Sequence, residues 1–143
     1  MRLRISLPAA LFVAAALAPT LCMAQPPGTA PAKIDLTIVL DPADPNVGTS
    51  ACTFPVQIHV TGKSKTFTLP GNRLIVTAPG QFATVTNLSH TSKEVTLNIT
   101  GVFTYFNQPD GGFVAIGTGR NLVTDPKFGL TLVVGRFSFA FDG

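Results

Sequence analysis

Apolar and polar residues alternate along most of this chain, and this two-residue repeat is the feature that most restricts its fold. Between Ile34 and Leu40, isoleucine or leucine stands at every even position. Successive side chains of a β-strand point to opposite faces, so the repeat predicts strands with one buried face. No segment after Ala24 shows the 3.6-residue apolar repeat of an amphipathic helix. The expected strands are 33–40, 56–61, 66–69, 73–77, 81–86, 95–100, 102–107, 113–117, and 130–134 continuing past Gly135 into 136–142.

Turn residues separate most of these strands. Gly62-Lys63 predicts a tight turn inside a hairpin. The segment 108–112, with proline early and glycines where a positive φ is needed, is the strongest hairpin signal. About eight or nine short strands joined in this way predict a single antiparallel all-β domain. We favour a closed or partly closed barrel over a β-sandwich, because consecutive hairpins give an up-and-down meander and closure removes its exposed edges.

The first 24 residues are typical of a secretory signal peptide, which we expect to form a short helix. Arg2 and Arg4 make the charged start, 11–17 the apolar middle, and 22–24 the cleavage site. The apolar run is too short to span a bilayer core of roughly 30 Å. We therefore expect export to an extracellular location, with no transmembrane segment after signal cleavage.

Cleavage after Ala24 would leave a leader at 25–32, rich in proline and alanine, and one all-β domain at 33–143. The leader has no apolar repeat and is expected to be flexible. The formal net charge of +3 includes Arg2 and Arg4, so their loss leaves a charge near +1. A nucleic acid or an anionic membrane would require a clustered positive field, so neither is an expected partner.

After export and signal cleavage, the chain would carry one cysteine thiol in an oxidising compartment. Cys22 leaves with the signal peptide, and Cys52 then has no partner within the chain. A lipoprotein signal would keep Cys22 as the first residue, but it requires a small residue before the cysteine, where this chain has Leu21. Cys52 is then a buried thiol, half of an intermolecular disulfide in a Cys52-linked dimer, or a catalytic thiol. Neither His59 nor His90 can be placed beside it from the sequence.

A search for catalytic and metal-binding motifs returns nothing. Nucleophile elbows, phosphate-binding glycine loops, His-Glu-x-x-His and Cys-x-x-Cys are all absent from the sequence. We therefore expect no catalytic residue, no metal and no cofactor, and a protein that is not an enzyme. A hydrolase or isomerase on a small β-barrel is kept as a third hypothesis, to be tested through Asp125, His59 and Arg120.

Binding residues are harder to select, because polar strand faces are ordinary. The glycine-rich segment 117–121 places Arg120 and Asn121 where they could line a pocket for an anionic group, or it forms a bulge or bend at a sheet corner. Arg120, Asn121 and Tyr105 are the candidate ligand-binding residues. Threonines such as Thr84 could also bind sugar or another surface, although solvated threonine faces are common in strands.

Four segments carry a family resemblance: CTFPV at 52–56, ATVTNL at 83–88, NITG at 98–101 and GTGRNL at 117–122. With them the chain resembles a group of uncharacterised small secreted proteins of actinomycetes. The resemblance implies a secreted location and an all-β fold, and no activity. Members of that group often carry a second cysteine near the C-terminus that could pair with the early one. This chain has none there, so we expect no intramolecular disulfide after signal cleavage.

The leading hypothesis is a secreted, non-enzymatic β domain that binds a small apolar ligand or an extracellular partner. The alternative is a structural or adhesive cell-surface domain whose core is filled by its own side chains. The volume of the domain interior distinguishes these two hypotheses. A barrel with the small residues Ala83, Ala115 and Gly117 inside could hold a ligand. A sandwich filled by phenylalanines could not; those residues are Phe103, Phe113, Phe137, Phe139 and Phe141.

Overall fold

The computed structural model describes residues 3–5, 30–43, 52–71, 73–109, 111–125 and 128–141. These ranges contain strands and no helix, so the predicted all-β class is confirmed. The strands are β1 (Leu3–Ile5), β2 (Ala32–Leu40), β3 (Val56–Leu69), β4 (Arg73–Thr77), β5 (Phe82–Asn87), β6 (Glu94–Asn98), β7 (Gly101–Asn107), β8 (Phe113–Asp125) and β9 (Gly129–Phe141).

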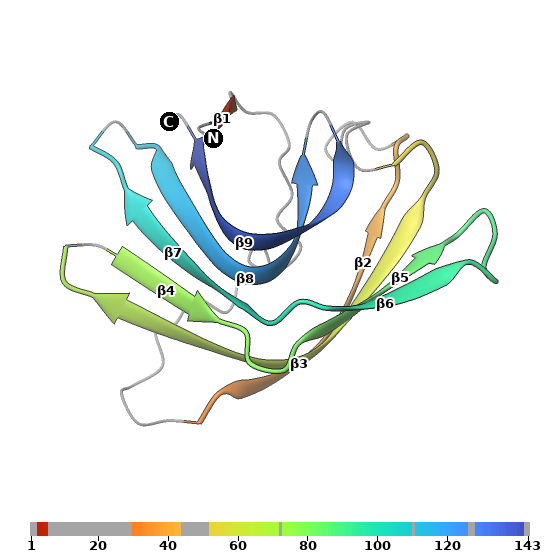
Figure 1. The fold of residues 1–143 in the computed structure, drawn as a ribbon, viewed down its shortest axis with the longest axis horizontal. Coiled ribbons are helices and arrows are strands. Elements are labelled where there is room, and N and C mark those ends of the chain that lie inside the picture. Colours follow the sequence, from red (N-terminus) through yellow and green to blue (C-terminus); the bar gives the residue numbers. More distant parts are fainter. Residues whose placement is uncertain are drawn as a thin grey trace.

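From β3 onwards the chain runs up and down through one antiparallel sheet (Figure 1). β4 and β5 follow each other along β3, with β5 paired to its first half and β4 to its second half. β6 and β7 repeat this arrangement, β6 beside β5 and β7 beside β4. β8 pairs with β7, and β9 pairs with β8 along its whole length. The expected meander is therefore present, with β2 added beside the first half of β3.

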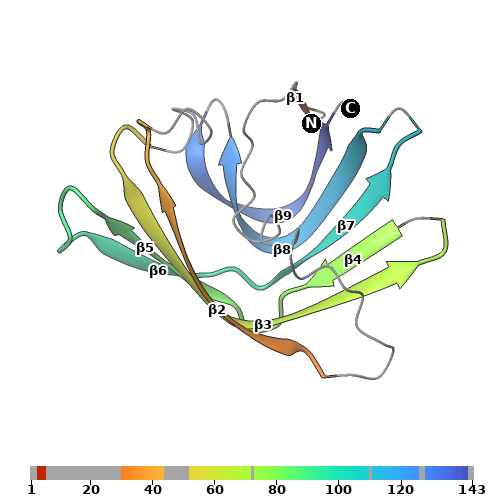
Figure 2. The same cartoon turned by 180° about the vertical axis from the view of Figure 1, so that it is seen from behind.

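The sheet is not closed, so the barrel that we favoured from the sequence was wrong. The strand order is β1-β9-β8-β7-β4-β3-β5-β6, with β2 as an additional partner of β3. In the described part of the chain β6 pairs only with β5, and no pairing joins it to β9 at the other end. The β8–β9 hairpin bends over the sheet instead of continuing around to β6. Figures 1 and 2 show the resulting open and strongly curved sheet from opposite sides.

Glycines with a positive φ bend the three longest strands, β3, β8 and β9. Gly62 lies inside β3 with a φ of 130°, so the hairpin predicted at Gly62-Lys63 is wrong and β3 continues to Leu69. Gly119 in β8 and Gly135 in β9 are opposite each other, with φ values of 92° and 111°. Only glycine adopts such values at little cost, and a strand that stays paired through them bends rather than ends.

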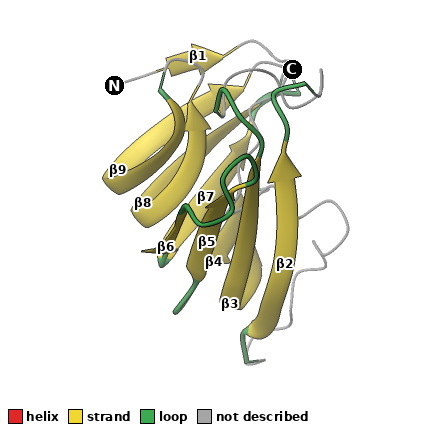
Figure 3. Ribbon diagram, turned by 90° about the vertical axis from the view of Figure 1, so that its right-hand side faces the viewer, coloured by secondary structure: helices red, strands yellow, loops and turns green. Residues whose placement is uncertain are grey.

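These bends divide the molecule into two regions. In the single-layer region the second half of β3, β4, β7, the first half of β8 and the second half of β9 form one sheet. In the two-layer region the sheet of β2, the first half of β3, β5 and β6 is covered by the turned end of the hairpin, residues 120–125 and 128–134, which we call the β8–β9 arm. Figure 3 shows β8 and β9 on one side of the molecule and β2 and β3 on the other.

Each region has its own hydrophobic cluster. In the two-layer region the aliphatic core is formed by Leu40, Val56, Ile58, Val60, Ala83, Ile99 and Leu122. In the single-layer region the aromatic cluster is formed by Phe103, Tyr105, Phe113, Phe137 and Phe139. Ala115 is fully buried against the aromatic cluster, and Val123 of the β8–β9 arm packs with it from the inside of the bend.

The predicted signal peptide lies almost wholly outside the described residues. Residues 3–5 form β1 and pair in parallel with Phe139–Phe141 of β9, so the expected helix is not found there. Cleavage and export remain predictions. The predicted start of the domain at residue 33 is one residue after the start of β2 at Ala32.

Candidate functional site

A groove opens where β8 leaves its neighbour. β8 follows β7 from residue 113 to Gly119, and the Arg120 N–H then donates to the Thr100 carbonyl at 3.0 Å. Beyond this point β8 pairs only with β9, although β6 continues the line of β7. Because the β8–β9 arm rises over β5 and β6 instead of pairing with β6, an open space is left between the two layers. We call this space the β6 groove.

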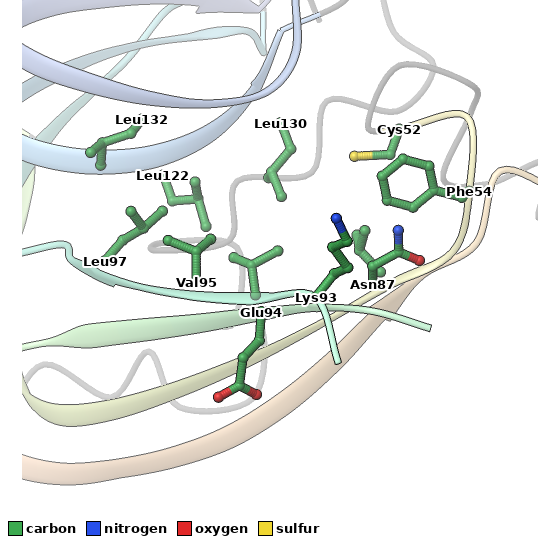
Figure 4. Close-up of a pocket in the computed structure, with 12 residues that line it drawn as sticks. Cys52, Phe54, Asn87, Lys93, Glu94, Val95, Leu97, Leu122, Leu130 and Leu132 are labelled. Atoms are coloured by element: carbon green, nitrogen blue, oxygen red, sulfur yellow. The ribbon is translucent and has the colours of Figure 1, made fainter. Parts of the chain in front are cut away.

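Apolar side chains form most of the groove wall (Figure 4). The volume is about 470 Å³. Val95 of β6 is 50% exposed and Phe54 is 37% exposed, so the groove is open to solvent along this edge. The apolar lining residues are Phe54, Val56, Val85, Val95, Leu97, Leu122, Leu130 and Leu132. Exposed apolar surface that is gathered in a concave site is typical of a binding surface.

Four polar residues also line the groove, and three of them, Cys52, Asn87 and Lys93, lie at one end of it. In Figure 4, Cys52, Asn87 and Lys93 lie at the end near Phe54, while Leu132 lies at the opposite end. The Lys93 ammonium points toward the groove, and the carboxylate of Glu94 points away from it. This follows from strand alternation, because adjacent side chains of β6 point to opposite faces.

Cys52 is a free, half-buried cysteine beside the β8–β9 arm. Burial raises the pKa of its thiol, and a hydrogen bond from the Leu130 backbone opposes this shift only in part. A thiol with a raised pKa is protonated at neutral pH and is a slow nucleophile. Its surroundings therefore favour a packed thiol over a catalytic one, and the Cys52-linked dimer stays a prediction.

The three candidate ligand-binding residues from the sequence are not brought together. Arg120 is exposed, and none of the three lines the groove. Asn121 is 1% exposed, and its Nδ2 donates to the Thr118 carbonyl at 3.2 Å. Tyr105 belongs to the aromatic cluster, with its ring centroid 6.0 Å from that of Phe103. The segment 117–121 is the bend at a sheet corner that the sequence offered as its other interpretation.

None of the three residues named for the enzyme hypothesis lines the groove: Arg120 is exposed, and the side chains of His59 and Asp125 have partners of their own. His59 Nε2 lies 2.9 Å from Asp35 Oδ1 on the outer face of the β2–β3 pair. Asp125 accepts a hydrogen bond from the Phe128 backbone N–H at 3.0 Å, at the tip of the β8–β9 hairpin. Among the residues that the structure describes, no three His, Cys, Asp or Glu side chains are grouped closely enough to hold a metal ion.

No protein-family model, curated protein or solved structure matches this chain. No helix within the described ranges is long and apolar enough to cross a membrane. The described residues therefore form an open all-β sheet with a candidate binding surface at the β6 groove.

Proposed function

We propose that this protein is a secreted, non-enzymatic β domain that binds a small apolar ligand in the β6 groove. The observation that carries the proposal is a groove of about 470 Å³ with eight apolar lining residues. Sites for small molecules usually measure about 300–1,000 Å³ and are mostly apolar with a few polar groups. Covering apolar surface is favourable by about 25 cal/mol per Å², so an apolar ligand would gain free energy by leaving water.

The ligand site differs from the barrel interior that we expected. Ala83, Ala115 and Gly117, the small residues expected to surround a cavity, are buried against other side chains. A Cβ on Gly117 would overlap the ring of Phe137. Side chains of the protein itself therefore fill the space beside these small residues. The β6 groove is the better candidate for the ligand site.

A structural or adhesive surface domain is the second candidate function, favoured by the aromatic cluster. Phe137 packs edge-on against Phe139 at 5.3 Å between centroids and against Phe103 at 5.8 Å. Such packing fills the single-layer region without any ligand. A purely structural role does not explain why Val95 is exposed at the edge of the groove. We therefore favour ligand binding over a structural role.

The proposal is tested by native mass spectrometry of the protein secreted by its own host, with titration of the neutral apolar dye Nile red. We expect extra mass of a few hundred daltons that survives gentle ionisation, or dye binding to the ligand-free protein. The variant Val95→Asn should weaken dye binding severalfold. Val39→Asn is the matched control, because Val39 is also a strand valine that is 50% exposed but lies outside the groove.

A bare mass together with no dye binding would overturn ligand binding and leave the structural domain. Equal loss of dye binding in the Val95→Asn and Val39→Asn variants would show that the dye reads general exposure and not the groove. A doubled mass that is lost on reduction would assign Cys52 to an intermolecular disulfide.

A further inference from the structure

The two ends of the β6 groove present different chemistry. One end is lined by Leu97, Leu122 and Leu132, and the other by Asn87, Lys93 and the Cys52 thiol (Figure 4). A ligand that is apolar throughout would leave the polar end without a partner. A ligand that carries a polar group at one end of an apolar chain would match both ends.

The turn after β5 fixes the orientation of the Asn87 amide. Its Oδ1 accepts hydrogen bonds from the Ser89 N–H at 2.8 Å and the His90 N–H at 3.2 Å. Since an amide oxygen that accepts from two backbone donors cannot be exchanged with the NH2 group, Nδ2 must point the other way. In Figure 4 this nitrogen points to the side of the groove where Cys52 and Phe54 lie.

Lys93 is held beside Asn87 by its backbone. The Lys93 carbonyl accepts from the Asn87 N–H at 2.9 Å, and the Lys93 N–H donates to the His90 carbonyl at 2.8 Å. Strand alternation then places the Lys93 side chain on the same face as Val95 and Leu97. Within the described ranges Lys93 forms no ion pair, and the neighbouring Glu94 carboxylate points away. One end of the groove therefore presents an ammonium and an amide N–H, both of which are donors.

We infer that the ligand of the β6 groove is a long-chain carboxylate, bound as a single molecule. Its carboxylate accepts hydrogen bonds from Lys93 Nζ and Asn87 Nδ2, and its alkyl chain lies along Val95 toward Leu97, Leu122 and Leu132. Charge complementarity selects the carboxylate over a neutral head group, because charge-assisted hydrogen bonds are stronger than neutral ones. A membrane surface is disfavoured, since binding to anionic lipids uses clusters of about four to eight basic residues and the groove has one. This inference rests on the proposed function and names the ligand class of the same site.

The experiment compares dodecanoate with dodecanol, two ligands of equal chain length, as competitors of Nile red on the ligand-free secreted protein. We expect dodecanoate to bind about three- to ten-fold more tightly, a modest factor because Lys93 is exposed. Lys93→Gln should reduce dodecanoate binding to the level of dodecanol and leave dodecanol binding unchanged. Lys63→Gln is the matched control, an exposed lysine outside the groove, and should change neither.

The outcomes separate this inference from the function on which it rests. Equal binding of the two ligands, with no effect of Lys93→Gln, would overturn the carboxylate site and leave apolar ligand binding intact. Absence of binding by both ligands and by the dye would overturn the proposed function itself. Co-sedimentation with phosphatidylglycerol vesicles that is lost in Lys93→Gln would assign the site to a membrane surface instead. A dimer in sedimentation velocity that Val95→Asn disrupts would assign the groove to a second copy of the chain.

Discussion

The single-layer and two-layer regions are built from the same long strands, and the β6 groove lies in the two-layer region. In the single-layer region β3, β4, β7, β8 and β9 are each hydrogen-bonded to the next strand of the sheet in that order. The aromatic cluster covers one face of these strands. In the two-layer region β8 leaves β7 at Gly119, and the β8–β9 arm covers the aliphatic core. The paired bends at Gly119 of β8 and Gly135 of β9 therefore separate the aromatic cluster from the region with the groove.

This difference shows how a small sheet can form a binding site without closing into a barrel. In the single-layer region the aromatic rings bury one another, and Val123 of the β8–β9 arm packs against them. Two packed layers share a hydrophobic core, but a space remains between them along the side where no strand connects the two layers. Here the open side is the edge of β6, where Val95 is exposed.

The largest effect is expected inside the two-layer region, from Ile58→Ala. Ile58 is fully buried in the aliphatic core, and its truncation should cost about 3–4 kcal/mol of unfolding free energy. Leu97→Ala removes a half-buried groove residue and should cost about 1 kcal/mol. Urea unfolding measures both. Equal losses of unfolding free energy in the two variants would mean that the groove is packed as tightly as the aliphatic core. The distinction between a closed core and an open groove would then be wrong.

The next largest effect is expected in the single-layer region, from Gly117→Ala. The new methyl would overlap the Phe137 ring, so the aromatic cluster must move, at a cost of about 2 kcal/mol. Phe137→Leu should recover part of this loss in the double variant, because the smaller side chain makes room for the methyl. If Gly117→Ala is neutral in urea unfolding, the aromatic cluster has free space and is not the filled region described above.

Strand positions were largely predictable from the sequence, because alternation is local. β2, β4 and β7 lie within a residue or two of the predicted ranges. The turn at Gly62 and the end near Gly117 were wrong for a common physical reason. A glycine with a positive φ can end a strand or bend it, and pairing decides which. The pairing of β3 with β2 and β5, and of β8 with β9, comes from distant residues.

The site was not predicted, because its residues carry no chemical signature. Arg120 was selected for its charge, and the structure places it outside the groove. The groove is made mainly of leucines and valines from five strands, β3, β5, β6, β8 and β9, which meet only after β8 bends at Gly119. One local signal was available, since Leu130 and Leu132 alternate with polar or apolar neighbours inside the predicted strand 130–134.

A smaller effect is expected from Asn121→Ala, at the boundary between the two regions. Asn121 is buried beside Gly101, where an added Cβ would come 2.5 Å from its Oδ1. Loss of its hydrogen bond to Thr118 should cost about 1–2 kcal/mol, while dye binding in the groove stays unchanged. Arg120→Ala is the control and should change neither. Weaker dye binding in Asn121→Ala at native stability would return Asn121 to the ligand site.

The smallest effect is expected on the outer face of the two-layer region, where Asp35 and His59 form an exposed cross-strand pair. The hydrogen bond from His59 lowers the pKa of Asp35 below its usual 3.8. A lowered carboxyl pKa contributes stability that is present above the unfolded-state value and is lost as pH falls through the folded-state value. His59→Gln should therefore reduce the urea midpoint slightly at about pH 6 and have no effect at about pH 2.

Thr96→Val is the matched control, because it breaks the neutral Thr84–Thr96 hydrogen bond of 3.0 Å on the same face and should show no such pH dependence. If the effect of His59→Gln is the same at both pH values, the pair does not act through the charge of Asp35, and the outer face adds nothing ionic to the stability of the two-layer region.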